Sequence, residues 1–435
     1  MNAIPAVTLS PRAVPQAAPR PCRVALLGFG TVGRAVATIL QAGSFPQLRL
    51  EFIYNRRVDR KRVPWISPHV RWTDDIEQVL ASDANVILEL AGGIEPAYSW
   101  AKRALLLGKS VVTANKKLIA THGPELLDLA RRQGCRLEFG AAVAGGVPVL
   151  CGVSPGLSGD RLLKLCGILN GTCNYILHAM ESRGVTLEAA LREAQQRGYA
   201  EADPTDDVDG FDARAKLAIL VRTGFHLQAD PEQIAVHSIR PVRPADFRYA
   251  REFGCTVRQV ARAELNAGTL LAEVGPALVT ASSPLGTARS NQNVLVTTGK
   301  YGGETVFAGA GAGGAPTAVA VVSDLLAVAE LRPAAASGPA LVATPLSGDF
   351  RGRHYVRVVP AEKTDVVAAL RRTLTAAGVS LRGLLHHPDP NDRRPSLALA
   401  VEECSTQALD KALRQLQEGG LLAEPPLRMP VLTSS

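Results

Sequence analysis

The stretch RVALLGFGTVGRAVA (residues 23–37) joins a short apolar strand, through a glycine-rich turn, to a helix that we expect to end near Gln41. Gly28 permits a tight turn, Gly30 lets the backbone approach a pyrophosphate, and Gly33 allows the helix to pack closely on the strand. Because both flanking elements are present, the G-x-G-x-x-G spacing favours a dinucleotide-binding site over a purely structural turn. The residues expected to contact this cofactor are Gly28, Phe29, Gly30, Thr31, Val32 and Gly33.

From this stretch to Pro148, strand patterns alternate with helix patterns. We predict strands at 48–54, 85–90, 110–112 and 136–139, and helices at 75–81, 96–107 and 124–133. Alternation of this kind is typical of an α/β protein with a doubly wound, mostly parallel sheet, in which ligands bind where the strands end. Lys116 follows one such strand end, so it is a candidate for the site, although a surface lysine is an equally good interpretation.

The end of the second predicted strand bears on the choice of cofactor. A carboxylate there would bind the adenosine ribose of NAD, but the chain has Asn55, Arg56 and Arg57. Cationic side chains suit the 2′-phosphate of NADP, so Arg56 favours NADP. Asp59 lies nearby and keeps NAD use open.

The composition is that of a globular protein whose expected partners are anionic small molecules. The 435 residues suffice for two or three domains, and 46% of them are hydrophobic. The net charge of +8 comes from scattered arginines without interleaved aromatics, so we expect no nucleic-acid binding. No apolar stretch has the length of a membrane span, and the seven cysteines show no disulfide framework, so we expect a cytoplasmic protein. Residues 1–21 are read as a disordered leader without the apolar core of a signal peptide.

The chain changes character after Pro148, and the later elements are less regular. Strands are expected at 161–169, 270–274 and 293–298, and a glycine-rich turn at 309–317 opens an apolar helix. Residues 331–349 are read as a linker. Residues 350–430 follow a β-α-β-β-α order, which predicts a small ferredoxin-like module.

The stretch GYAEADPTDDVDGFDARAK (198–216) is the main candidate for catalysis. It carries six acidic residues and then enters a helix on which Asp212 and Lys216, four residues apart, share one face. A lysine beside a carboxylate can act as a positioned proton donor. An ordinary surface ion pair behind a solvated loop is the alternative for this stretch taken alone.

Several segments, in order over about 23–325, together resemble homoserine dehydrogenase. They are GFGTVG (28–33), VTANK (112–116), AVAGGVP (142–148), GILNGTCNYI (167–176), GYAEADPTDDV (198–208), GFDARAKL (210–217) and GAGxxPT (311–317). The resemblance implies a Rossmann domain at 22–148, completed by about 305–330, with a substrate-binding and dimerisation domain at 149–304. It also implies a homodimer or higher homo-oligomer, and reversible NAD(P)H-dependent reduction of aspartate 4-semialdehyde to homoserine.

The same resemblance implies roles for individual residues. Lys216 is similar to the family's general acid/base, and Asp212 to the residue that orients it and contacts the substrate. Lys116 would contact substrate and cofactor, and Glu201 would bind the substrate ammonium. The remaining implied contacts are Asp207 and Thr172 in the substrate pocket, and Gly198 and Gly311 at the cofactor.

Two departures from the family pattern alter what the resemblance implies. Family members often have a glutamate that ligates sodium where this chain has Gly140, so a tight sodium site is not expected, although the carbonyls of Val143, Gly145 and Val147 are retained. The C-terminal module resembles an ACT domain in its element order only, because an Asp-x-Pro-Gly turn is missing at 361–365. Threonine is the effector that an ACT domain would imply.

Two other readings of the chain compete with this resemblance. An aldehyde dehydrogenase that forms a thioester needs a nucleophilic cysteine and a histidine base, for which Cys173 and His178 are the best candidates. A non-catalytic sensor would bind nucleotide and amino acid without needing Lys216. Loss of turnover on substitution of Lys216 separates the enzyme from the sensor.

Overall fold

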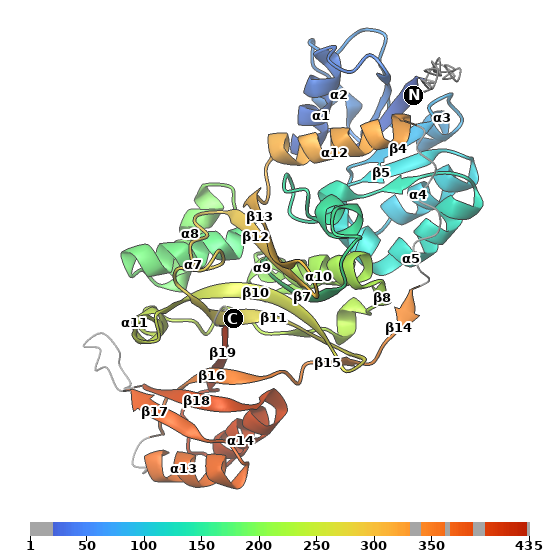
Figure 1. Ribbon diagram of the computed structural model, residues 1–435. Coiled ribbons are helices and arrows are strands. Elements are labelled where there is room, and N and C mark those ends of the chain that lie inside the picture. The colour runs from blue at the N-terminus through green and yellow to red at the C-terminus, as the bar shows by residue number, and fades with distance from the viewer. Residues whose placement is uncertain (1–20, 331–340, 362–365, 386–395, 433–435) are drawn as a thin grey trace, which may run out of the picture.

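The protein is described by a computed structural model that covers residues 21–330, 341–361, 366–385 and 396–432. Three parts follow one another along the long axis of the molecule: a Rossmann-type domain, a middle domain built on a long sheet, and a C-terminal module (Figure 1). The predicted leader, most of the predicted linker and the turn at 362–365 fall wholly or largely outside the described residues.

The first domain holds six parallel strands in the order β3-β2-β1-β4-β5-β6. The strands are β1 (Cys22–Leu27), β2 (Leu48–Tyr54), β3 (Arg71–Thr73), β4 (Val86–Glu89), β5 (Ser110–Thr113) and β6 (Leu137–Glu138). The connecting helices are α1 (Thr31–Gln41), α2 (Val58–Lys61), α3 (Ile76–Leu80), α4 (Ala97–Leu106) and α5 (Lys116–Arg132). This is the doubly wound order of dinucleotide-binding domains, so the predicted α/β fold class is confirmed.

A helix from much later in the chain completes this domain. Helix α12 (Gly314–Ala329) lies beside α1 (Figure 1). Its Val321 and Leu325 are buried in the same cluster as Leu26 of β1 and Val36 of α1. The chain therefore leaves the first domain after β6 and returns to it with α12.

Helix α5 begins earlier than the sequence analysis predicted. The predicted start was Pro124, because proline is favoured in the first turn of a helix. In the structure α5 begins at Lys116, and Pro124 lies inside it. Proline cannot donate a hydrogen bond to the carbonyl of Ala120. The Arg222 guanidinium compensates by donating to the carbonyls of Ile119 (2.7 Å) and Ala120 (3.1 Å).

The middle domain is built on the strands β13-β12-β7-β10-β11. These are β7 (Leu162–Ile168), β10 (Cys255–Asn266), β11 (Thr269–Thr280), β12 (Gln292–Gly299) and β13 (Gly303–Ala310). Its helices are α6 (Val149–Cys151), α7 (Gly171–Arg183), α8 (Leu187–Gln196), α9 (Thr205–Val208), α10 (Phe211–Phe225) and α11 (Pro244–Glu252). Short elements complete it: η2 (Gly152–Gly156), η3 (Pro231–Gln233), β8 (Leu227–Gln228) and β9 (Ala235–Val236). The short helix η1 (Gly140–Ala142) precedes it and belongs to the first domain, since Ala141 is buried in the same cluster as Leu325 of α12. The pairing of β13 with β12 extends to Ala310, so the sheet of this domain continues past residue 304, where the sequence analysis placed the end of the domain.

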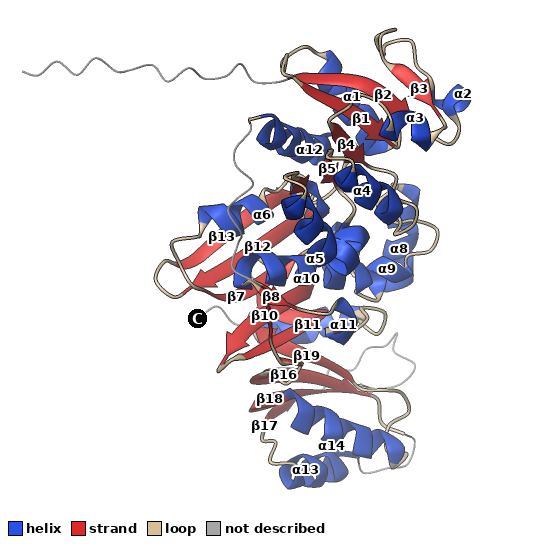
Figure 2. Ribbon diagram, turned by 90° about the vertical axis from the view of Figure 1, so that its right-hand side faces the viewer, coloured by secondary structure: helices blue, strands red, loops and turns tan. Residues whose placement is uncertain are grey.

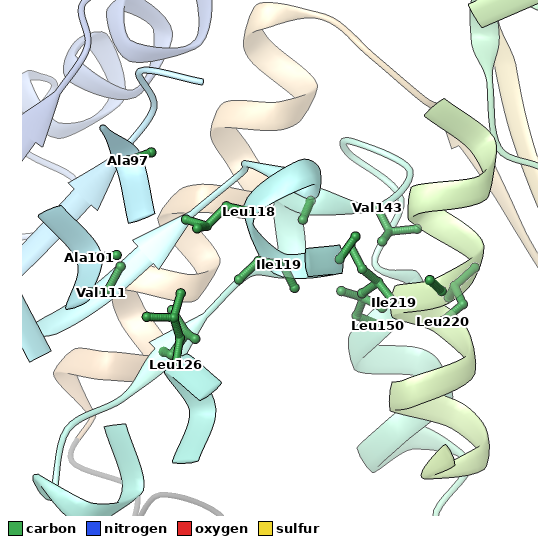
Figure 3. Close-up of a cluster of buried hydrophobic side chains, with 14 of the residues drawn as sticks. Ala97, Ala101, Val111, Leu118, Ile119, Leu126, Val143, Leu150, Ile219 and Leu220 are labelled. Atoms are coloured by element: carbon green, nitrogen blue, oxygen red, sulfur yellow. The ribbon is translucent and has the colours of Figure 1, made fainter. Parts of the chain in front are cut away.

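One hydrophobic core joins the first and middle domains. Figure 3 shows Leu118 and Ile119 of α5 between Val111 of the first sheet and Ile219 and Leu220 of α10. All five side chains are buried in a single cluster. This shared core fixes the start of α5 relative to α10, where the candidate catalytic residues lie.

The C-terminal module has one strand more than predicted. Its elements run β16 (Arg351–Val358), α13 (Val366–Ala376), β17 (Leu381–Leu385), β18 (Leu397–Ser405), α14 (Thr406–Glu418) and β19 (Leu427–Leu432). The strand order β19-β16-β18-β17 and the β-α-β-β-α-β sequence are those of a ferredoxin-like unit. The added strand also pairs with β11, Leu278 lying opposite Val431, so the sheets of the module and the middle domain are continuous.

Two very short strands, β14 (Val342–Ala343) and β15 (Leu346–Ser347), connect the middle domain to the module (Figure 1). Figure 2 shows α13 and α14 of the module together on one side of β16, β18 and β17. They pair with β8 and β11. In the part of the chain that the structure describes, no helix has the length and apolarity required to cross a lipid bilayer.

Candidate active site

Three charged residues predicted from two separate motifs meet between α5 and α10. Lys116 is the first residue of α5, whereas Asp212 and Lys216 lie one turn apart near the start of α10. The buried Asp212 carboxylate forms an ion pair with Lys116 through Oδ1 and with Lys216 through Oδ2, the latter at 2.7 Å. The i,i+4 spacing predicted the second pair, but only the packing of α5 on α10 brings Lys116 to the same carboxylate.

The surroundings drive the pKa values of these three groups apart. Burial alone would raise the pKa of Asp212, but the two ammonium groups hold it well below its usual range. Burial lowers the pKa of Lys216 from 10.5, and the charge of Lys116 adds to this effect, so the attraction of Asp212 does not restore it. The pKa of Lys116 is raised instead, because Asp212 and neighbouring acids outweigh its own desolvation. Lys216 therefore releases its proton more readily than Lys116 does.

Lys216 is held from two sides. Its Nζ donates to Asp212 and to the carbonyl of Leu169 (2.7 Å) at the end of β7. An ammonium group has three N–H bonds, so one remains for a substrate oxygen. The buried Asn293 amide donates to the same Leu169 carbonyl at 3.1 Å, which fixes that acceptor from the neighbouring strand β12.

Asn170 links the two acids of the site, and the sequence analysis assigned it no role. Its side-chain nitrogen donates to Asp207 Oδ1 (2.6 Å) and to Asp212 Oδ2 (2.8 Å). Its side-chain oxygen accepts the backbone N–H of Cys173 (2.8 Å), which caps α7. The only signal in the sequence was an N-cap asparagine before a helix, and that signal does not predict the two carboxylates.

Some of the residues predicted on or beside the acidic loop contact the site, and others do not. Burial raises the pKa of Asp207, against the hydrogen bond from Asn170. Asp206, which was not predicted, pairs with Lys117 of α5 at 2.5 Å. The Thr172 hydroxyl donates to the backbone of Tyr199 (2.7 Å) at the start of the loop. Glu201 is exposed, and its backbone carbonyl accepts a hydrogen bond from the Gln195 side chain at 3.1 Å.

The glycine-rich turn after β1 has the shape that a dinucleotide requires. Gly28 has φ +100°, and a Cβ there would lie 2.7 Å from the carbonyl of Leu90. A Cβ at Gly33 would collide with the Gly28 carbonyl, whereas nothing lies within 4 Å of the Cβ position of Gly30. Gly30 also caps α1 without a side-chain hydrogen bond, which leaves the helix N-terminus to the backbone N–H groups. These features fit a pyrophosphate at this helix end.

The surroundings of Glu89 and of three other predicted cofactor contacts, Arg56, Gly311 and Gly198, are also defined. Glu89, which the sequence analysis did not single out, is fully buried and accepts from Thr113 (2.6 Å) and from the turn after β4. Arg56 is exposed just past β2. A Cβ at Gly311 would collide with Asn293, and Gly198 has φ +75° in open space. Glycine is thus required by packing at residue 311 and by backbone conformation at residue 198.

The residues around Gly140 do not reproduce the acidic sodium ligand of the family pattern. Instead, the carboxylate of Asp324 from α12 occupies the space beside Gly140, with Oδ1 2.6 Å from the position a Cβ would take. It accepts hydrogen bonds from the backbone N–H groups of Gly140 and Ala141. The carbonyl of Val147 accepts the N–H of Val149 at 2.7 Å. No group of three His, Cys, Asp or Glu suited to a metal occurs among the described residues. The expectation that a tight sodium site is lacking, with only the carbonyls of Val143, Gly145 and Val147 retained as ligands, stays a prediction, and no catalytic step depends on it.

Cys173 does not have the surroundings of a catalytic thiol. Its side chain is fully buried at the start of α7, and Sγ donates to the carbonyl of Asp207 at 3.1 Å. Burial, together with the charges of Asp207 and Asp212, raises the pKa of Cys173 well above its usual value. Nucleophilic cysteines need the opposite shift, so the thioester reading loses its best candidate.

Comparison with known proteins matches this chain to one family along nearly its whole length. The model of the homoserine dehydrogenase NAD-binding domain matches residues 28–140, and that of homoserine dehydrogenase matches residues 148–326. The homoserine dehydrogenase of Mycobacterium tuberculosis (strain H37Rv) is 38% identical over 406 residues, which cover 88% of this chain and 90% of the relative.

Solved structures agree with the sequence relatives. The crystal structure of a homoserine dehydrogenase from Thiobacillus denitrificans superposes with a TM-score of 0.87 and 30% identity, covering 95% of this chain and 98% of the other. A hyperthermophilic archaeal homoserine dehydrogenase in complex with NADPH superposes with a TM-score of 0.63 and 29% identity, covering 72% and 99% of the two chains.

Proposed function

The chain belongs to the homoserine dehydrogenase family, and from this premise we propose that Lys216 is the residue that moves the proton in its reversible reduction of aspartate 4-semialdehyde to homoserine. The observation that carries the proposal is the Asp212 carboxylate shared by Lys216 and Lys116. A nicotinamide cofactor supplies the hydride when it is bound. The protein must then bind the amino-acid substrate and protonate the alkoxide that forms at its aldehyde carbon.

The geometry favours Lys216 over Lys116 as the proton donor. Lys216 is the more deeply buried lysine, its side chain being 12% exposed against 35% for Lys116. Its pKa is lowered by burial, which brings it closer to the range in which a lysine transfers protons efficiently. Asp212 and the Leu169 carbonyl fix the direction of its remaining N–H bond. Lys116, whose pKa is raised, stays charged and suits a contact to the substrate carboxylate or the cofactor.

The acidic groups provide the other half of substrate recognition. An amino acid presents an ammonium group, which pairs with carboxylates. Asn170 donates to both Asp207 and Asp212, so Asp207 is held close enough to Asp212 to line the same substrate pocket. Thr172 lies at the start of α7, two residues after Asn170. Glu201 is exposed on the acidic loop, and its contact with the substrate ammonium rests on the family resemblance alone.

The experiment that tests the role of Lys216 is turnover of Lys216→Ala with aspartate semialdehyde and NADPH. We expect kcat to fall by about 10² or more with the fold retained, because general acid–base groups commonly contribute this much. Lys164→Ala is the matched control, since Lys164 is an exposed lysine on β7 paired with Glu264 at 3.4 Å. Full turnover by Lys216→Ala would refute the assignment.

We also propose that NADP is the preferred cofactor, on the strength of Arg56. It is exposed at the end of β2, where a 2′-phosphate would lie. Arg56→Ala should raise KM for NADPH by about tenfold and leave KM for NADH unchanged, because a hydrogen bond between charged groups is lost with one cofactor only. Arg49, exposed at the opposite end of the same strand, is the control for a general change in charge.

The homodimer and the threonine effector of the ACT-like module are proposed from the family resemblance. The edge strand β13 supports the dimer, because Val306 is 44% exposed on a strand with one free edge. Light scattering of the wild type and of Val306→Lys tests it, with a smaller particle expected for the variant. Turnover with and without added threonine tests the effector.

A further inference from the structure

A short segment, residues 238–243, connects the acidic loop of the active site to the C-terminal module. We name this segment the strap. It leaves β9 behind α9, the helix that carries Asp207, and it ends where α11 begins. Hydrogen bonds hold one end of the strap to α9 and the residue after it, and the other end to the C-terminal module.

The first end of the strap is bonded to the back of α9. The backbone N–H of Ile239 donates to the carbonyl of Val208 at 2.9 Å, and the Ser238 hydroxyl donates to Asp209 at 2.6 Å. The Arg240 guanidinium donates to both oxygens of Asp209, at 2.9 and 3.2 Å. The strap therefore holds the two residues that directly follow Asp207.

The second end of the strap is bonded to β16 of the module. The Arg357 guanidinium, 3% exposed, donates to the carbonyl of Pro241 at 2.6 Å and to Asp246 at 2.8 Å. The fully buried Asp246 also accepts the backbone N–H of Arg243 at 2.7 Å. Glu424 of the module joins the side chains of Arg243 (2.8 Å) and Arg357 (3.2 Å).

We propose that the C-terminal module positions the acidic loop of the active site through the strap, with Arg357 as the positioning residue. Arg240, which is clamped to Asp209, is directly followed by Pro241, whose carbonyl is held by Arg357 of the module. Both clamps use charged, bidentate or buried hydrogen bonds. Movement of β16 must therefore be transmitted to Asp209 or break one of the two clamps. The inference rests on the function proposed above, because it assumes that Asp207 lines the substrate pocket.

A role of Arg357 in holding the module together, and nothing more, makes a different prediction. In that case its loss would loosen contacts within residues 350–430 and leave α9 unchanged. A positioning role requires instead that the backbone of α9, on the far side of the strap, opens more often. Amide hydrogen exchange distinguishes the two, because it reports local opening segment by segment.

The test compares Arg357→Gln with the wild type in substrate-free protein and in turnover. We expect faster amide exchange at 205–210 and 238–243, a rise in KM for aspartate semialdehyde of about threefold to tenfold, and kcat within about twofold. Arg351→Gln is the matched control, because Arg351 lies on the same strand in an exposed ion pair with Glu403 at 3.0 Å. Unchanged KM, with faster exchange confined to the module, would overturn the proposal.

A second variant protects the test against misfolding of Arg357→Gln. Arg240→Gln breaks the clamp on Asp209 at a half-exposed site, with the Arg240 side chain 47% exposed, and should raise KM to a similar extent. The double variant should then be no worse than the more severe single variant, because both break the same path. KM increases that multiply would show independent effects and refute the coupling. A wild type without turnover would overturn the proposed function, while the exchange data would still decide the role of the strap.

Discussion

Asp324 is a buried acid with an unusual environment, and its replacement by asparagine has a measurable consequence. Its Oδ2 atom is buried and has no hydrogen-bond partner among the described residues, whereas the backbone N–H groups of Gly140 and Ala141 donate to the carboxylate. Burial, with a further contribution from the charge of Glu138, raises the pKa of Asp324 from 3.8 to about 7. The folded protein therefore binds this proton more tightly than the unfolded chain does.

The sign and size of the effect follow from this difference. Between the unfolded pKa of 3.8 and the folded pKa of about 7, the native state carries the proton and the unfolded state does not. The free energy of unfolding must therefore fall as the pH rises through this window and level off above it. Between about pH 5 and about pH 8, Asp324 should lower the free energy of unfolding by roughly 3 kcal/mol, at 1.36 kcal/mol per pKa unit.

Asp324→Asn keeps the shape and cannot ionise, so it should remove this pH dependence and make the protein more stable than the wild type at about pH 8. Urea unfolding followed by tryptophan fluorescence reports the relevant domain, because Trp65, Trp72 and Trp100 all lie in the first domain, on which α12 packs. Asp83→Asn, at a side chain that is 83% exposed, is the control. Parallel stability curves for Asp324→Asn and the wild type would show that the carboxyl is not perturbed and refute the reasoning.

Three further predictions test other parts of the site. Asn170→Leu should lower kcat/KM by about tenfold or more, because it leaves the buried Asp212 and the half-buried Asp207 without their shared donor; kcat/KM equal to that of wild type would count against its role. Gly123→Ala should lower the midpoint of thermal unfolding, since a Cβ there would lie 2.5 Å from the Arg222 guanidinium, and an unchanged midpoint would contradict that packing. The rate of aldehyde reduction should fall as the pH rises through a pKa below 10.5, because Lys216 must be protonated to act as a donor; a pH–rate profile that stays level to 10.5 would exclude it.

Local sequence patterns predicted most strands of the first domain, but not β3, α2 or the start of α5. The strand at 48–54 was predicted to the residue, and the glycine turn and the helix to Gln41 lie where the spacing placed them. These features depend on interactions between near neighbours in the chain: buried strands need continuous apolar runs, and tight turns need glycine. The i,i+4 pair of Asp212 and Lys216 is equally local, and the structure contains it.

The later strands were harder to predict for a physical reason. Strand β10 contains Arg258, which is 2% exposed, and Arg262, whose partner Glu273 lies on the neighbouring strand β11. Charged residues interrupt the apolar pattern by which a buried strand is predicted, so the segment resembles a loop when the ion-pair partners are not known. The final strand β19 was missed for a related reason, since its place is set by pairing with β16 and β11 rather than by its own pattern.

The sequence by itself determined the dinucleotide-binding domain, the glycines that a cofactor requires and the family to which the chain belongs, because these depend on short-range order along the chain. Only the tertiary structure decided that Lys116 reaches Asp212, that Asn170 joins two acids and that the module is tied to the active site through the strap. Each of these contacts joins residues far apart in sequence. They exist because α5, α7, α10 and β16 pack around common buried charges, and no local pattern encodes that packing.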